Sequence, residues 1–391
     1  MVGVRGEQKE GTDLTFRCLK KIAILLLILS LTGCWDRLEI ENRIFVLAVA
    51  IDKVAKKEGK ILYELTIQVA EPKALSGKSP PTDIKPVWNV SVTGYSIFDC
   101  MRSMATEVAR IPFYEHLQVI VISEELAKEG IAAPMDLFLR DHELRRKTNL
   151  VVAPGQAKDV LDINHKLIPV PGVYLSMLTQ ESVNKTSKMP QNSTVDTFSV
   201  NFRANRNTLL TKVEPREDHV IMQGGAILNK DKFAGWLNSN EVRSYQWVIG
   251  TVRAGNYLTV NDKENQVFTT FEVKNMRSII KPHIRNGDPY FTIRIIVEGN
   301  IGEDSILPNS TPGDLRKIEQ MLNQNIRHDA DTVIQKLQKE IGLDIFGFGE
   351  QLRRHKYAYW KQHEQDWENL FRTVDVNVEV ETSIRRIGHV K

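Results

Sequence analysis

Residues 311–349 read TPGDLRKIEQMLNQNIRHDADTVIQKLQKEIGLDIFGFG, and the C-terminal part of the chain is organised around them. Thr311 and Pro312 form a strong helix start, because the hydroxyl can cap the first turn and the fixed φ of proline suits it. Apolar residues then recur every three or four positions, which is the spacing of one helix face. Gly342 ends this pattern, as glycine commonly does after a helix. The sequence predicts a long helix whose apolar face comprises Leu315, Ile318, Leu322, Ile326, Ala330, Val333, Leu337 and Ile341.

The segment Gly347–Gly349 follows this helix. It lacks the spacing of a phosphate-binding loop and does not follow a strand, so nucleotide binding is disfavoured. Glycines permit unusual backbone dihedrals, which predicts a tight corner in which Phe346 and Phe348 fill the gap between two helices. A corner that contacts a partner is the alternative. The second helix is predicted over 350–371, giving a long C-terminal helix pair.

The rest of the C-terminal part alternates in the manner of strands. Runs at 251–259, 266–274, 276–284 and 290–299 predict antiparallel strands, with a turn at Asn286–Pro289. A returning strand with one buried face is predicted where valines alternate with polar residues. These valines are Val374, Val376, Val378 and Val380.

Strands and helices alternate in the N-terminal part, from a buried strand at Phe45–Ile51 to a helix at Gly155–Leu161. This order predicts an α/β or α+β layer with a mixed sheet. The segments 182–192 and 204–217 are polar, and the first is predicted to be a mobile loop or linker. Gly224–Gly225 within an apolar run predicts a strand with a bulge.

The predicted fold class is therefore α+β, multi-domain, with mixed and antiparallel sheets and flanking helices. The predicted divisions are a signal peptide at 1–33, an N-terminal α/β domain at 34–180, a middle α+β domain with a polar linker at 181–262, and a C-terminal α+β domain at 263–391.

The segment Lys20–Trp35 has the build of an export signal. Two lysines precede an apolar run from Ile22 to Leu31, and small residues then lead to Cys34. The run spans about 15 Å as a helix, half the hydrocarbon core, so it is too short for a transmembrane span. Leu31–Cys34 resembles a bacterial lipobox, in which the cysteine thiol receives a diacylglyceryl group and becomes the mature N-terminus. An ordinary signal followed by a chance cysteine is the alternative.

Charge and cysteine content exclude several classes. The net charge of +3 falls to +1 without residues 1–33, which hold five basic and three acidic side chains. That balance disfavours nucleic acid as a partner, because nucleic acid calls for a clustered basic surface. Once Cys18 leaves with the signal and Cys34 is acylated, Cys100 is the remaining thiol, and an internal disulfide is excluded.

The chemistry-bearing motifs predict no enzyme, no cofactor and no metal. His363–Trp367 fails as a zinc motif because tryptophan stands where the second histidine belongs. Arg140 and Asp141 begin a charged run that is either a solvated face or a docking patch for a partner or for lipid headgroups. Arg140, Asp141, Phe346 and Phe348 are therefore the candidate partner-contact residues, and Cys34 is the candidate lipidation site.

The mature chain resembles a known family along nearly its whole length. The resemblance begins at Cys34–Ile40, continues through His116–Ile122 and Phe138–Asp141, and is densest at Gly342–Gly349. These segments are similar to the C-subunit lipoproteins of nutrient germinant receptors in spore-forming bacteria, the GerAC type. The resemblance implies three α+β domains, a lipid anchor on the outer face of the inner spore membrane, and assembly with two integral-membrane subunits, A and B.

Two functions from different classes follow. The first is a non-catalytic receptor subunit, needed for receptor assembly and for the response to nutrient in germination, and confined by its lipid near its membrane partners. The second is a solute-binding lipoprotein that captures the germinant or another small nutrient, which requires a cleft with convergent polar groups.

Overall fold

The computed structural model describes residues 19–21, 43–71, 85–140, 144–163, 168–253, 257–262, 267–304 and 312–387. Residues Ile44–Lys391 form one compact unit. Cys34 and Asp141 lie outside the described residues, so their predicted roles remain predictions.

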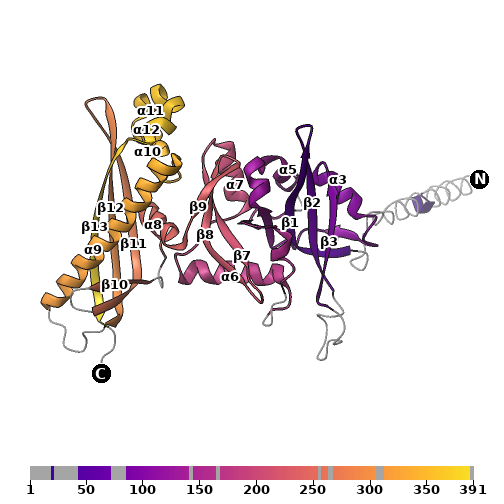
Figure 1. The fold of residues 1–391 in the computed structure, drawn as a ribbon, viewed down its shortest axis with the longest axis horizontal. Helices are drawn as coiled ribbons and strands as arrows, with labels where there is room; N and C mark the ends of the chain where they lie inside the picture. Colours follow the sequence, from indigo (N-terminus) through magenta and orange to yellow (C-terminus); the bar gives the residue numbers. More distant parts are fainter. Residues whose placement is uncertain are drawn as a thin grey trace, which may run out of the picture. The chain divides into compact units, whose positions relative to one another are not determined.

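A nine-stranded mixed sheet occupies the first part of the larger unit (Figure 1). Its strand order is β3-β2-β1-β5-β6-β7-β8-β9, with β4 paired to β1. Pairing is parallel from β1 through β5 and β6 to β7, and antiparallel at both ends. The strands are β1 (Arg43–Lys57), β2 (Lys60–Ala70), β3 (Val87–Gly94), β4 (Ile111–Phe113), β5 (Val119–Ser123), β6 (Asn149–Ala153), β7 (Thr208–Pro215), β8 (Val220–Asn229) and β9 (Lys232–Leu237).

Helices cover both faces of this sheet, as alternate residues of β5 show. Ile120 and Ile122 join one buried cluster together with Phe198 of α7, whereas Val121 joins a second cluster with Leu175 of α6. A strand buried on both faces reads as a continuous apolar run, and all five residues of β5 are buried. The helical segments here are α3 (Ile97–Met104), α4 (Glu124–Glu129), α5 (Ala132–Arg140), a 3-10 turn (Lys158–Val160), α6 (Pro171–Lys185) and α7 (Val195–Arg203).

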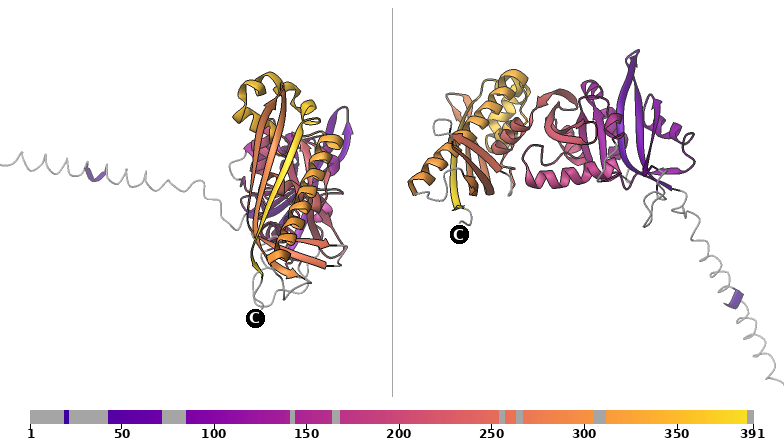
Figure 2. Two further views of the ribbon diagram at one scale, coloured as in Figure 1. Left: turned by 90° about the vertical axis from the view of Figure 1, so that its left-hand side faces the viewer. Right: turned by 60° about the horizontal axis from the view of Figure 1, so that its bottom comes forward.

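A four-stranded sheet of order β10-β11-β12-β13 forms the C-terminal part, and β13 joins β12 in parallel. Figures 1 and 2 show α9 running alongside this sheet, and the Ile384 amide of β13 donates to Glu319 of α9 over 2.9 Å. The elements are α8 (Ser239–Ile249), β10 (Tyr257–Asp262), β11 (Val267–Arg285), β12 (Asp288–Asp304), α9 (Pro312–Gln335), α10 (Phe348–His355), α11 (Tyr357–His363), α12 (Trp367–Phe371) and β13 (Asp375–Ile387).

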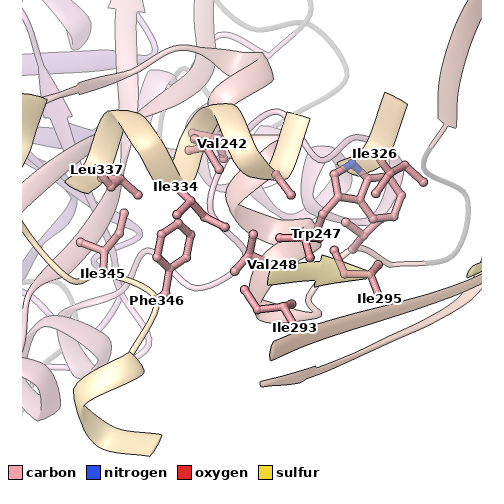
Figure 3. Close-up of a cluster of buried hydrophobic side chains, with 14 of the residues drawn as sticks. Val242, Trp247, Val248, Ile293, Ile295, Ile326, Ile334, Leu337, Ile345 and Phe346 are labelled. Atoms are coloured by element: carbon pink, nitrogen blue, oxygen red, sulfur yellow. The ribbon is translucent and has the colours of Figure 1, made fainter. Parts of the chain in front are cut away.

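The long helix is confirmed, with two local changes near its end. After α9, residues Lys336–Ile341 form a π-helical turn, and Gly342 caps it in the left-handed conformation with φ of +77°. The turn keeps Leu337 fully buried, and Figure 3 shows this residue with Ile334 and Phe346 in the cluster. The α+β class, with mixed and antiparallel sheets, is confirmed by these elements.

The predicted second member of the long helix pair is wrong as a single helix. The segment breaks into α10, α11, a 3-10 turn (Glu364–Asp366) and α12. A continuous helix of that length would be a rod of about 30 Å. The breaks instead let Trp360 and Trp367 both pack over Gly349, with their ring centroids 5.9 Å apart.

One polar segment was mispredicted, and another, for which no structure was predicted, is regular. Residues 182–185 continue α6 rather than forming a loop, because this helix buries Leu175 and Val183 against the sheet. The polar segment 204–217 contains β7, whose Leu210 and Val213 are fully buried. The bulge near Gly224 is confirmed, since the β7–β8 register shifts there and Gly224 has φ of +80°. The predicted domain boundary at 180/181 falls within α6, and the three-domain division remains a prediction.

Candidate interaction site: the Asp344 corner and its groove

The Asp344 corner is the segment from Gly342 to Gly349 between the π-helical turn and α10. Gly342 and Gly347 both have positive φ, which an L side chain rarely adopts. An added Cβ at Gly342 would also collide with the guanidinium of Arg372. The two glycines therefore allow the chain to reverse direction within a few residues.

Asp344 holds the corner together through four hydrogen bonds. Its Oδ1 accepts from the amides of Gly347 and Phe348 at 2.9 and 3.2 Å, and its Oδ2 accepts from the Gly349 amide at 2.8 Å. The indole N–H of Trp367 donates to the same Oδ2 over 3.0 Å. Burial raises the pKa of Asp344, and these four hydrogen bonds oppose that rise. A carboxylate with all its acceptor sites engaged is a structural anchor, because it leaves little capacity for proton transfer.

Phe346 and Phe348 plug the corner as the sequence predicts. The Phe348 ring is fully buried and stacks on Phe291 of β12 with centroids 4.6 Å apart. Phe346 is 7% exposed, stacks on Phe348 at 5.1 Å and on Tyr245 of α8 at 5.7 Å. Figure 3 shows Phe346 and Ile345 close to Ile334 and Leu337. The corner is thus part of the core that joins α8, α9 and β12.

A groove of about 970 Å³ opens beside this corner. One wall comes from the corner and from α10–α12, and the other from α7, β7 and the segment before α7. Asn207 ties the two walls, since its Nδ2 donates to the Asp344 carbonyl over 3.3 Å and its Oδ1 accepts from the Lys230 amide at 3.3 Å. Amide and hydroxyl side chains dominate the second wall, namely Gln191, Asn192, Thr197, Asn201, Asn205, Asn207 and Thr208.

The groove also contains aromatic and charged side chains. Trp360 and Trp367 line the first wall together with Glu350, whose carboxylate is paired with Arg353 and Arg354. Those pairs lower the pKa of Glu350 to about 2. The lining holds three cations (Arg206, Lys230 and Arg353) and four carboxylates (Asp344, Glu350, Glu364 and Glu368), so its charges nearly balance. Amides and indole faces suit recognition by hydrogen bonds and stacking, so the groove can bind a polar partner without a strong net field.

The predicted contact residues are scattered. Arg140, at the end of α5, is exposed and pairs with Asp136 one helical turn away at 2.8 Å. Phe346 and Phe348 lie in the core, which leaves their side chains little surface to offer. Partner contact by these three residues remains a prediction. The amides of the groove escaped sequence analysis, although Asn201, Asn205 and Asn207 cluster at the start of the polar segment 204–217.

Comparison with known families shows which family the chain belongs to. A family model described as "Spore germination protein N-terminal domain" matches residues 36–215, and one described as "Spore germination B3/ GerAC like, C-terminal" matches residues 223–388. The chain belongs to the GerAC family. Membership places it among spore germination proteins and confirms the resemblance seen in the sequence.

Individual GerAC-family relatives match over nearly their full length. Spore germination protein B3 of Bacillus subtilis (strain 168) is 27% identical over 375 residues, which cover 94% of this chain and 97% of that protein. Spore germination protein KC of the same organism is 24% identical, covering 95% and 96%. The crystal structure of the GerBC protein shares the fold, with a TM-score of 0.58 at 23% identity, covering 86% of this chain and 96% of that one.

Across the described ranges of this GerAC-family chain, the helices are either too short or too polar to cross a bilayer. Within the same ranges, acidic, histidine and cysteine side chains do not gather in groups of three or more that could hold a metal ion.

Proposed function

We propose that the chain is a non-catalytic, lipid-anchored C subunit of a nutrient germinant receptor. The anchor is Cys34, and the body lies at the outer face of the inner spore membrane. There it assembles with the integral-membrane A and B subunits and is needed for the response to nutrient. The observation that carries this proposal is the match of both family models, which together extend from residue 36 to residue 388.

The anchor works through two acyl chains on one thiol. Each buried CH₂ contributes about 0.8 kcal/mol, and one chain binds marginally while two bind stably. Confinement to the membrane surface raises the effective concentration of the body toward its partners, so modest contacts are sufficient for assembly. The groove beside the Asp344 corner is the concave surface we assign to those contacts, because its amides can pair with exposed backbone of a partner loop.

Pull-down of membrane proteins tests the proposal. The wild-type chain is expected to recover the A and B subunits from native membranes, and Cys34→Ala is expected to recover far less. Cys100→Ala is the matched control, because it removes the buried thiol and leaves the anchor intact. Equal recovery by wild type and Cys34→Ala would contradict confinement. Mass spectrometry of the mature chain independently checks the lipid on Cys34.

A solute-binding lipoprotein is the second candidate, and the groove is the observation that favours it. Its volume of about 970 Å³ lies at the upper end for small-molecule sites, and its lining supplies convergent polar groups. Titration of the chain with amino acids and sugars tests this function. Saturable binding that Asn201→Ala weakens, and that Asn377→Ala on β13 leaves unchanged, would support solute capture. Heat signals equal to the dilution blank would exclude it.

A further inference from the structure

Three aromatic side chains meet where the nine-stranded sheet begins. The Phe45 ring lies 6.0 Å from Phe113 and 5.3 Å from His116, and the latter two are 6.1 Å apart. Phe45 is near the start of β1, and Phe113 ends β4, which pairs with β1. His116 is exposed, and both phenylalanines are partly exposed.

Two further large apolar side chains are exposed at this end of the sheet. Ile111, two residues before Phe113 in β4, is 55% exposed. Trp88 is 50% exposed near the start of β3, and the strand register places it in one row with Val69 and Val46. Trp88 therefore lies at the same end of the sheet as the start of β1, on the face that carries Val46, whereas Phe45 alternates to the opposite face. We call Phe45, Trp88, Ile111, Phe113 and His116 together the β1-end patch.

The chain length before β1 limits how far this patch can lie from the anchor. Arg43 is nine residues after Cys34. An extended chain spans at most about 3.5 Å per residue, so the start of β1 lies within about 30 Å of the acylated residue. Any tether shorter than full extension brings the β1 end of the sheet closer to the bilayer than that.

We propose that the β1-end patch contacts the lipid headgroup region directly, as a second attachment beside the acyl chains at Cys34. This inference rests on the proposed lipid anchor. Tryptophan is enriched at the membrane interface because its ring combines an apolar body with a polar N–H, and phenylalanine contributes apolar area to surfaces that lie in the interface. A small patch is sufficient at this end, because the tether already holds the protein near the bilayer. The patch then only has to set the orientation of the body relative to the membrane.

The charged side chains beside the patch are compatible with contact to lipid headgroups. Arg110 precedes Ile111, and Lys85 lies three residues before Trp88, so a cation accompanies each protruding apolar side chain. Glu115 adds one carboxylate next to His116, and Glu71, whose amide donates to the Pro86 carbonyl over 2.9 Å, adds another near Trp88. The mixed charge predicts contact with zwitterionic and anionic lipid alike.

Tryptophan quenching by brominated lipid tests the proposal. The lipid-anchored chain, with acylation verified by mass spectrometry, is placed on vesicles of bromine-labelled phosphatidylcholine and phosphatidylglycerol. Trp35→Phe is the background in every sample, because Trp35 adjoins the acylated residue. Fluorescence is expected to be quenched in this background, to lose most of that quenching with Trp88→Phe, and to keep it with the control Trp360→Phe. Ile111→Ser is expected to reduce quenching while Trp88 is still present.

Each other outcome is informative. Quenching that persists unchanged in Trp88→Phe, or that is missing in the Trp35→Phe background, would overturn the lipid contact. Acrylamide quenching provides a second check. If Trp88 becomes shielded from acrylamide only when native membrane proteins are added, the patch binds a protein partner and the proposed lipid contact is wrong. An unmodified Cys34 would instead contradict the proposed anchor, and a maleimide lipid coupled to Cys34 then lets the Trp88 measurement proceed. Circular dichroism checks that every variant is folded.

Discussion

The two sheets of this molecule are buried in different ways. The nine-stranded sheet is packed on both faces, so neighbouring residues of β5 such as Ile120 and Val121 belong to different buried clusters. The four-stranded sheet buries one face against α8 and α9, and on β13 Val378 is buried while Asn377 and Glu379 are exposed. The first arrangement requires an apolar residue at every position of a central strand, and the second requires one at every other position.

That difference explains which parts tolerate polar residues. In the first sheet, specificity depends on long-range covering by helices such as α6. In the second, a single apolar face, one long helix and the Asp344 corner carry the packing. Four measurements can break or sharpen this contrast.

The largest effect is expected from charges placed in β5. Ile120→Asp and Val121→Asp each bury an unpaired carboxylate on opposite faces, and each is expected to lower the free energy of unfolding by roughly 5 kcal/mol or more. On β13, Val378→Asp should act similarly, whereas Asn377→Asp should change it by less than about 0.5 kcal/mol. Denaturant unfolding followed by circular dichroism measures all four. Tolerance of either β5 substitution would show that one face of the first sheet is not a core.

The second largest effect is expected at the aromatic plug. Phe348→Ala removes a fully buried ring that stacks on Phe291 and Phe346, and the resulting cavity is expected to cost about 4 kcal/mol. Tyr357→Ala, at a ring that is 60% exposed, is the matched control and should cost below about 0.5 kcal/mol. Thermal melts of the two variants give the comparison. Similar midpoints would mean that the corner is not part of the C-terminal core.

Two hydrogen-bonded aspartates, Asp344 (half-buried) and Asp52 (buried), allow the two regions to be compared directly. Asp344 accepts four hydrogen bonds, whereas Asp52 of β1 accepts backbone hydrogen bonds from Ala157 at 2.7 Å and Lys158 at 3.0 Å. Asp344→Asn is expected to lower the free energy of unfolding by about 2–3 kcal/mol. The reason is that an amide accepts hydrogen bonds only on its oxygen, so some of the donors are left unpaired. Asp52→Asn should cost less, since fewer donors are affected. A larger loss for Asp52→Asn in urea unfolding would reverse our ranking.

The smallest effect concerns acid. The pKa of Glu350, hydrogen-bonded to Arg353 and Arg354, is lowered to about 2, and that of Glu129 is lowered to about 2 by Lys56 and Lys53. A lowered folded-state pKa means that the unfolded chain binds more protons, so this stability is present above about pH 4.5 and is lost as pH falls toward 2. Glu350→Gln is expected to cost about 1 kcal/mol at neutral pH and to flatten that part of the profile. Glu129→Gln should flatten it in the same window. An unchanged pH profile in both variants would show that these pairs contribute nothing.

The sequence predicted local structure best where burial is one-sided. The apolar face from Leu315 to Ile341 identified α9, and the glycines around Phe348 identified the corner. Both predictions succeeded because the residues that form each pattern are only a few positions apart in the sequence. By contrast, α6 and β7 were missed. The polar residues at the end of α6 suggested a loop, and no element was assigned to the polar segment that contains β7. The burial of Leu175 and Val213 that makes both elements regular depends on strands far away in the sequence.

The groove could not be predicted for the same reason. Asn207 and Asp344 are 137 residues apart, and nothing in either local pattern indicates that they meet. Sequence analysis identified the corner, but the groove beside it arises from the way β7 joins the sheet. The register of β6 with β7 pairs Val151 with Thr211. This pairing is set by tertiary packing, and the local sequence pattern does not predict it.

The β7–β8 hairpin has a consequence for dividing this protein into its two modules. The two family models stop and restart between residues 215 and 223, at the turn of the hairpin, whose strands pair from Thr208↔Leu228 to Pro215↔Val220. Halves separated there would each carry a naked strand edge, a known route to aggregation. Because β7 and β8 pair across the boundary between the two modules, either module produced alone is expected to aggregate more readily than the whole chain.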